Sequence, residues 1–292
     1  MLLIAANRFP NQLRKDLIER RFAVTFEVTT PRPDQSLHEI EAFARDLACE
    51  PRVSAVAVTD RVRSDEDRDP VDVASMVAEA SGRQPLVHWA GKGRSSADFA
   101  GALHHADEAG LENVLCLTGD KVRAHVAGET RYLDAVNQVV QARATHPVLL
   151  LGVAVGTFKY REEELLNQYI KLAKKARVGA DFAISQIGWD MPKLRDLLSW
   201  LRMRGLSIPV MGSFMPLPLA VARRIHDGRI PGVLVTDGLL RRARDTGHVE
   251  VQALTVGQSV QFRLDSRVLS DEFEEVGPAG EVAQGVRGGN DE

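Results

Sequence analysis

The sequence predicts an α/β fold, a (β/α)8 barrel of the TIM type, from two observations. Short apolar runs rich in β-branched residues recur along the chain, and a longer segment with helical spacing follows each of them. With 292 residues and 44% hydrophobic content, the chain can bury a sizeable core. Because a single barrel of this length is common, we expect one principal domain.

Seven apolar runs are expected to form the parallel strands. They cover residues 22–27, 53–60, 85–89, 113–120, 148–155, 182–186 and 208–212. Each run ends at or near a polar or charged residue or a glycine. Parallel strands joined by crossover helices place their carboxyl ends on one rim, so polar residues that are remote in sequence should meet there. We expect the chemistry of the protein at that rim.

Seven helices are expected, one after each apolar run. They cover residues 36–49, 70–80, 95–109, 130–144, 162–176, 191–204 and 216–226. Ser95 and Ser96 can cap their helix, because a serine side chain accepts a hydrogen bond from a first-turn N–H. Pro70, Pro192 and Pro216 stand where the first helical turn tolerates a missing N–H. The spacing therefore predicts seven strand–helix units.

Two segments compete for the eighth strand that would close the barrel. Residues 232–237 form one apolar run, and residues 259–264 alternate apolar and polar side chains. The sequence leaves this choice open. We expect an N-terminal extension with a helix over residues 1–21 and the barrel over residues 22–277. Residues 278–292, rich in Gly, Glu and small side chains, are expected to form a disordered tail.

Composition argues against several classes of function. The net charge of -3 gives no bulk attraction to nucleic acid or anionic lipid, and no Lys/Arg stripe interleaved with aromatic residues occurs. The first apolar run is much shorter than a membrane span, and basic residues follow it, unlike in a secretory signal. Cys49 and Cys116 are too few and too far apart for a disulfide framework or a thiolate metal cage. We therefore expect a soluble cytoplasmic protein without a metal site, whose partners include neither nucleic acid nor a membrane.

Two carboxylates at strand ends are candidate catalytic groups. Glu27 ends an almost wholly apolar run, and partial desolvation there should favour its protonated form, as a proton donor near neutral pH requires. Asp120 follows Thr118 and Gly119, and a glycine lets the backbone approach a ligand closely. The alternatives are a salt-bridged rim carboxylate at Glu27 and an Asx turn at Asp120.

Four further polar residues at strand ends are candidates for binding. Gln186 is an amide suited to bidentate hydrogen bonding with the edge of a heterocycle, and equally to a structural bridge between loops. His88 lies between apolar neighbours, where a satisfied core histidine is the alternative. Thr59 and Asp60 can bind a polyol or cap the following loop.

Three lysines recur at helical spacing within residues 162–176. Such spacing is typical of a solvated face, and it equally allows contact with a phosphate if the helix edges the site. The lysines are Lys171, Lys174 and Lys175.

Taken in order, several of these segments resemble the methylenetetrahydrofolate reductase family. The shared segments are FEVTTP at 26–31, VAVT at 56–59, the histidine of LVHW, GLENVLCLTGD at 110–120, KKARVGADFAISQ at 174–186 and the Trp-Asp pair at 189–190. The resemblance extends over about residues 22–216. Its most specific parts are the Gly-Asp pair and the GADF segment with its following glutamine.

The resemblance implies a flavin-dependent barrel that interconverts methylenetetrahydrofolate and methyltetrahydrofolate by hydride transfer through FAD, with FMN left open. It implies that Glu27 is the general acid that helps to open the methylene bridge. Asp120 would lie beside the flavin and the pterin and tune both electrostatically, and Gln186 would hold the folate. The lysines would lie on the helix that faces the flavin's phosphate and ribose side. The positions implied to contact the flavin are Thr59, His88, Thr118, Gly119, Lys171, Lys174 and Lys175.

The chain departs from the family pattern at three places. Residues 28–30 replace paired aromatics and prolines, Thr118 replaces an arginine, and residues 155–159 replace a Tyr-Pro-Glu and a later histidine. Because the last change removes residues that would stack on nicotinamide, use of NAD(P)H does not follow from the resemblance. A redox partner protein can take its place. Tetrahydrofolate derivatives are the expected small-molecule partners, and a homo-oligomer is expected.

Two other functions fit the same residues. A flavin-free barrel that transfers a methyl group between tetrahydrofolate and a corrinoid protein would still use Glu27, Asp120 and Gln186, but would leave His88 and Lys175 without a purpose. A noncatalytic folate-binding subunit would have no use for the acid that the chain retains. The direction of the redox reaction stays open, because one site catalyses both directions.

Overall fold

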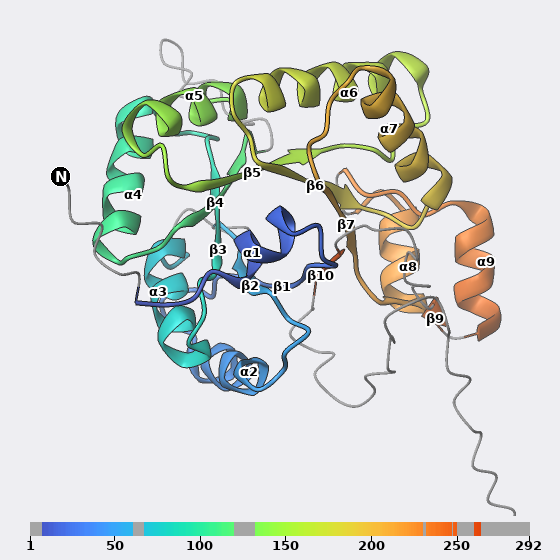
Figure 1. The fold of residues 1–292 in the computed structure, drawn as a ribbon. Helices are drawn as coiled ribbons and strands as arrows, with labels where there is room; N and C mark the ends of the chain where they lie inside the picture. The colour runs from blue at the N-terminus through green and yellow to red at the C-terminus, as the bar shows by residue number, and fades with distance from the viewer. Residues whose placement is uncertain are drawn as a thin grey trace, which may run out of the picture.

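The computed structural model describes residues 8–60, 67–119, 132–229, 232–246, 248–249 and 260–263. Within these ranges, parallel strands close into a barrel in the order β1-β10-β7-β6-β5-β4-β3-β2, which confirms the predicted fold (Figure 1). The barrel strands are β1 (Val24–Val28), β2 (Ala55–Val58), β3 (Leu86–Ala90), β4 (Asn113–Leu117), β5 (Leu150–Val155), β6 (Phe182–Ile187), β7 (Val210–Phe214) and β10 (Val260–Arg263). A small antiparallel sheet joins β8 (Leu217–Pro218) to β9 (His248–Val249).

Helices surround the barrel, and α1 lies across one of its open ends (Figure 1). The helices are α1 (Gln12–Ile18), α2 (His38–Ala48), α3 (Pro70–Ser81), α4 (Ser96–Glu108), α5 (Ala135–Thr145), α6 (Glu162–Arg177), α7 (Met191–Met203), α8 (Leu219–His226) and α9 (Asp237–Thr246). All seven predicted helices are present. In the part of the chain that the structure describes, no helix combines the length and the apolar character needed to cross a membrane.

Two helices, α5 and α8, begin three or more residues later than predicted, for local reasons. The side chain of Asp134 accepts hydrogen bonds from the main-chain N–H groups of Val136 and Asn137, so it fixes the start of α5 at Ala135. Residues 217–218 pair with β9, so α8 begins after them. Pro216 therefore precedes a strand, and its predicted place in a first helical turn is wrong.

The other predicted helix starts are confirmed to within two residues. Ser95 caps α4, and its reciprocal hydrogen bonds with Asp98 complete a capping box. Pro70 and Pro192 lie in the first turns of α3 and α7.

The second of the two candidate segments closes the barrel. β10 pairs in parallel with β1 on one side and with β7 on the other. The competing residues 232–237 form no strand. Gly232 has a φ of 79°, which interrupts an extended run, and α9 begins at Asp237. The expected tail at 278–292 lies outside the described residues.

The barrel has an apolar interior separate from the cores between strands and helices. Inward-facing side chains pack with two leucines of α1, Leu13 and Leu17, so α1 closes the amino end of the barrel. The inward residues of this cluster are Ala55, Ala57, Leu86, Leu115, Leu150, Phe182, Ile184 and Met211. The outward side chains of the same strands pack against the helices. The apolar interior lies between α1 and the carboxyl end of the barrel, where the predicted site residues stand.

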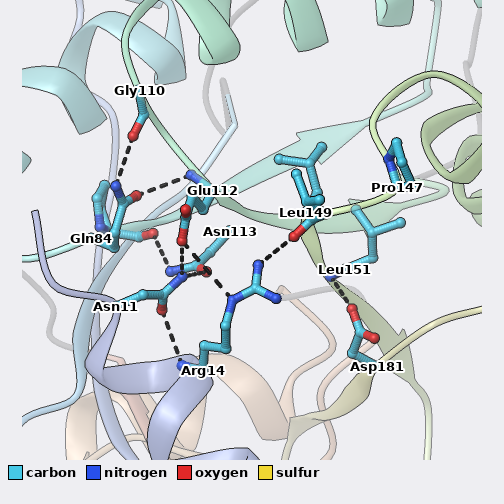
Figure 2. A network of polar contacts seen from close by, with 12 residues as sticks. Asn11, Arg14, Gln84, Gly110, Glu112, Asn113, Pro147, Leu149, Leu151 and Asp181 are labelled. Carbon is cyan, nitrogen blue, oxygen red and sulfur yellow. Dashed lines mark hydrogen bonds and ion pairs between the residues drawn. The ribbon is translucent and has the colours of Figure 1, made fainter. Parts of the chain in front are cut away.

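A polar network fixes α1 against the barrel (Figure 2). Asn11 caps the helix, and its Nδ2 donates to Glu112 Oε2 and Asn113 Oδ1, each at 2.7 Å. Arg14 donates to the main-chain oxygen of Val148 at 2.6 Å. These partners lie at or next to the amino ends of β4 and β5, so the network holds the end of the barrel opposite the predicted site.

Gly152 is required by the packing of the barrel interior. A Cβ at this position would lie 2.4 Å from Phe182 Cζ and 2.8 Å from Leu115 Cδ1. Both neighbours are buried, so neither can move away easily. We expect Gly152→Ala to lower the melting temperature by about 2–10 °C, the cost of overpacking a core.

Gly101 provides the matched control for this substitution. It lies in α4, and a Cβ there would meet no atom within 4 Å. Gly101→Ala should leave the melting temperature unchanged or raise it, because alanine favours a helix. A Gly152→Ala variant that melts at or above the wild-type temperature would show that the ring of Phe182 can adjust.

Candidate active site

Glu27 lies on the inner face of β1, near the carboxyl end of the strand. Its neighbours Phe26 and Val28 pack in a helix-facing core. Alternate residues of a strand point to opposite faces, so Glu27 points into the barrel. Only 7% of the residue is exposed. The structure thus places a buried carboxyl group on the inner wall at the mouth of the barrel.

Thr59 and His88 lie beside each other on the same inner wall. Val58 pairs with Val87, and both point outward, so the residues that follow them point inward. Each is 4% exposed. The main-chain N–H of Thr59 donates to the main-chain oxygen of Val28 at 3.0 Å, which ties this position to the end of β1.

Thr118 and Gly119 follow β4, but their contacts are structural. The Oγ1 of Thr118 accepts the main-chain N–H of Ala135 at 3.2 Å, at the start of α5. Gly119 has a φ of 78°, and a Cβ there would lie 2.9 Å from Lys92 Cβ, so both conformation and space require glycine. Asp120 lies outside the described residues, and its role stays a prediction.

Gln186 lies near the carboxyl end of β6 and is exposed. Its Oε1 accepts the main-chain N–H of Ile187 at 3.0 Å. A Cβ at Gly232 would lie 3.2 Å from its Nε2, so the connection between α8 and α9 runs close to this amide. The sequence left bidentate binding of a ligand and a structural bridge as equal alternatives for this amide, and here its oxygen is engaged by the backbone.

Lys175 differs from the other two lysines of α6. Its Nζ donates to the main-chain oxygen of Ala154 in β5 at 2.7 Å. Burial, and then the nearby ammonium of Lys171, lower the pKa of Lys175 from 10.5 to about 8. Lys171 and Lys174 are exposed. A cation is therefore held behind β5, while the other two lysines lie on the solvent side of the helix.

The strand-end carboxylate Asp60 turns out to be a structural group. Its side chain is 1% exposed and forms an ion pair with Arg94. It also accepts the main-chain N–H of Ala90 at 2.7 Å, and the guanidinium of Arg94 lies 5.0 Å from the ring centroid of Trp89. Asp60 therefore caps the following loop, which is one of the two roles predicted for it; the other was binding of a polyol. The partner Arg94 lies 34 residues away and gave no sequence signal.

The loop between β5 and α6 packs against the loop that follows β6. Phe158 is 7% exposed, and a Cβ at Gly188 would lie 2.2 Å from its ring. Tyr160 donates through its hydroxyl to Asp190 Oδ2 at 3.0 Å. The segment that departs from the family pattern thus serves to hold the residues after Gln186. Sequence reasoning missed this contact.

The described residues contain no group of three or more His, Cys, Asp or Glu side chains placed to hold a metal ion. Burial raises the pKa of Cys116 to about 12, so this cysteine stays a thiol at neutral pH.

Sequence comparison connects this site to known enzymes. The family model for methylenetetrahydrofolate reductase matches residues 12–237. Methylenetetrahydrofolate reductase 1 of Schizosaccharomyces pombe is 30% identical over 120 residues, which cover 40% of this chain and 20% of that protein. Methylenetetrahydrofolate reductase 2 of Saccharomyces cerevisiae is 29% identical over 144 residues, which cover 44% of this chain and 23% of that protein. The matched region thus spans about a fifth of either yeast protein.

Structural comparison finds the same barrel in solved proteins. An uncharacterized protein from Clostridium thermocellum that binds two copies of 5-methyl-5,6,7,8-tetrahydrofolic acid superposes with a TM-score of 0.63 at 12% identity, over 86% of this chain and 92% of that chain. Oxaloacetate acetylhydrolase superposes with a TM-score of 0.55 at 13% identity, over 89% and 82%. Identities this low show the fold alone. The family follows from the sequence model, whose match runs from α1 to the start of α9: this chain belongs to the methylenetetrahydrofolate reductase family.

Proposed function

We propose that this chain is a flavin-dependent oxidoreductase that interconverts methylenetetrahydrofolate and methyltetrahydrofolate. The observation that carries the proposal is that Glu27, Thr59, His88 and Gln186, remote in sequence, lie at or near the carboxyl ends of barrel strands in a chain of this family. The structural similarity to a barrel protein that binds 5-methyltetrahydrofolic acid supports a folate as the ligand.

In this proposal Glu27 holds the proton and Gln186 holds the folate. A carboxyl group on a buried wall can deliver a proton to a folate nitrogen as the methylene bridge opens. Gln186 lies three strands away around the barrel and is exposed, so its amide can bind the polar edge of a pterin. Asp120, beyond the described residues, is proposed to lie beside both ligands.

The residues present fit a flavin. Thr59 and His88 lie side by side on the inner wall, where the Thr59 hydroxyl accepts the main-chain N–H of Thr30 at 3.2 Å and keeps its own proton to donate to a ligand. Behind β5, burial and the charge of Lys171 lower the pKa of Lys175. An anionic phosphate beside the ammonium would stabilise its charged form and so offset both effects. When bound, a flavin would supply the hydride chemistry that amino acid side chains lack.

The visible absorption spectrum of the purified protein tests this proposal. We expect the bands of an oxidised flavin, and a released cofactor that chromatography identifies as FAD. A colourless protein that also fails to bind added flavin would contradict the proposal. If that colourless protein bound methyltetrahydrofolate tightly, methyl transfer to a corrinoid protein would become the better account.

A further inference from the structure

Gln186 stands in a β-bulge of β6. The register of β6 against β7 shifts between Ile184 and Ile187, so Ser185 and Gln186 together oppose a single residue of β7. A bulge bends its strand and changes the direction of the side chains within it. The direction of Gln186 therefore depends on the groups that close the bulge.

The hydroxyl of Ser185 bridges β6 and β7 at the bulge. Its Oγ accepts the main-chain N–H of Ser213 in β7, with 2.8 Å between the nitrogen and the oxygen. The same hydroxyl donates to the main-chain oxygen of Gln186 at 2.9 Å. Ser185 is 4% exposed, so water cannot readily replace either bond. One side chain thus satisfies a donor of β7 and an acceptor of β6 beside the irregular pairing.

The amide of Gln186 then lies between two constraints. Its Oε1 accepts the main-chain N–H of Ile187, and Gly232 lies close to its Nε2. Since the backbone fixes the oxygen end, the NH2 group is the end that can be offered to a ligand. This arrangement requires the backbone of residues 185–187 to keep its bulged course.

We propose that Ser185 is a positioning residue, whose hydroxyl holds the β6 bulge and thereby directs the amide of Gln186 towards the folate. The identity of the ligand rests on the proposed function. Without the hydroxyl, the main-chain N–H of Ser213 and the main-chain oxygen of Gln186 lose their partner. Residues 185–187 can then shift to regular pairing with β7. In a strand, a shift of one residue turns each side chain to the opposite face, so Gln186 would lose its direction.

Ser185→Ala, Ser185→Thr and Ser81→Ala form the test set. Ser81 is a matched control at the end of α3, because it is 7% exposed and its hydroxyl also bridges main-chain groups: it donates to the oxygen of Val77 at 2.7 Å, with the oxygen of Arg83 more distant at 3.5 Å, and accepts the N–H of Arg83. Binding of 5-methyltetrahydrofolate is measured by titration calorimetry, flavin binding by absorbance, and exchange of the Ile187 N–H by NMR.

We expect Ser185→Ala to raise the Kd for 5-methyltetrahydrofolate about tenfold, as the loss of one net hydrogen bond does. Ser185→Thr keeps the hydroxyl and should stay within about twofold of wild type, as should Ser81→Ala, because neither loses a hydrogen bond at the bulge. The flavin Kd should be unchanged in all three. Exchange of the Ile187 N–H should accelerate in Ser185→Ala only, because a displaced amide no longer accepts it.

Three outcomes would overturn the inference. These are wild-type folate affinity in Ser185→Ala, equal losses in Ser185→Ala and Ser185→Thr, or unchanged exchange at Ile187. If wild-type protein binds no folate, the proposed function fails, while exchange at Ile187 still decides whether Ser185 holds Gln186.

Discussion

Glu27→Gln should reduce turnover about 100-fold to 10,000-fold, the range that a positioned general acid contributes. The glutamine keeps the shape of the side chain but can neither donate a proton as the methylene bridge opens nor accept one as it closes in the oxidative direction. Flavin content should stay at the wild-type level, because Glu27 is proposed to act on the folate. Oxidation of methyltetrahydrofolate with an artificial electron acceptor measures the rate, and absorbance measures the flavin.

The control for this prediction lies at the other end of the barrel. Glu112 contacts Asn11 in the network that holds α1, and Glu112→Gln removes one carboxylate there (Figure 2). Its turnover should match wild type. Near-normal turnover in Glu27→Gln would refute the acid role and leave Glu27 as a structural carboxylate of the barrel wall.

Lys175→Met should raise the flavin Kd about tenfold to a hundredfold, since a hydrogen bond to a charged group contributes roughly 1.5–3 kcal/mol. Methionine keeps much of the length of the side chain and removes the charge. Lys15→Met, an exposed substitution on α1, is the control and should bind flavin like wild type. Equal affinities in both variants would place the anionic part of the flavin elsewhere.

The lowered pKa of Lys175 also predicts how this effect depends on pH. Since its pKa in the folded chain is about 8, wild-type flavin affinity should fall as pH rises through about 8, and Lys175→Met should show no such fall. In the unfolded chain the lysine stays protonated up to its ordinary pKa of 10.5. Between these values the unfolded chain binds more protons, so the stability of the flavin-free protein should rise with pH. Lys175→Met should therefore melt at a higher temperature than wild type near neutral pH. In thermal scans between pH 8 and 10.5, the difference between the two melting temperatures should become smaller as pH rises.

The parts of the fold that follow from local pattern could be predicted from the sequence. The apolar run over residues 22–27 placed Glu27 at a strand end with apolar neighbours, and Ser95 marked the start of α4 by its capping chemistry. The closing strand could not be chosen, because residues 232–237 and 259–264 both form short apolar patterns. Pairing with strands more than 40 residues away decided between them.

The parts of the site that depend on contacts distant in sequence could not be predicted. Nothing local to Asp60 points to Arg94, and nothing in the segment after β5 shows that Phe158 will lie on Gly188. The bulge at Gln186 is likewise a property of two strands together, since it arises from the pairing of β6 with β7. The GADF segment indicated that the glutamine after it belongs to the site. Only the structure shows how the β6 bulge holds that side chain.

An anaerobic titration of the flavin-loaded protein with 5-methyltetrahydrofolate tests the central claim most directly, because it asks whether folate and flavin exchange a hydride in this one barrel mouth. We expect the visible absorption of the oxidised flavin to be lost as about one equivalent of the folate is added, in step with two-electron reduction. Flavin that remains oxidised in the presence of bound 5-methyltetrahydrofolate would contradict it.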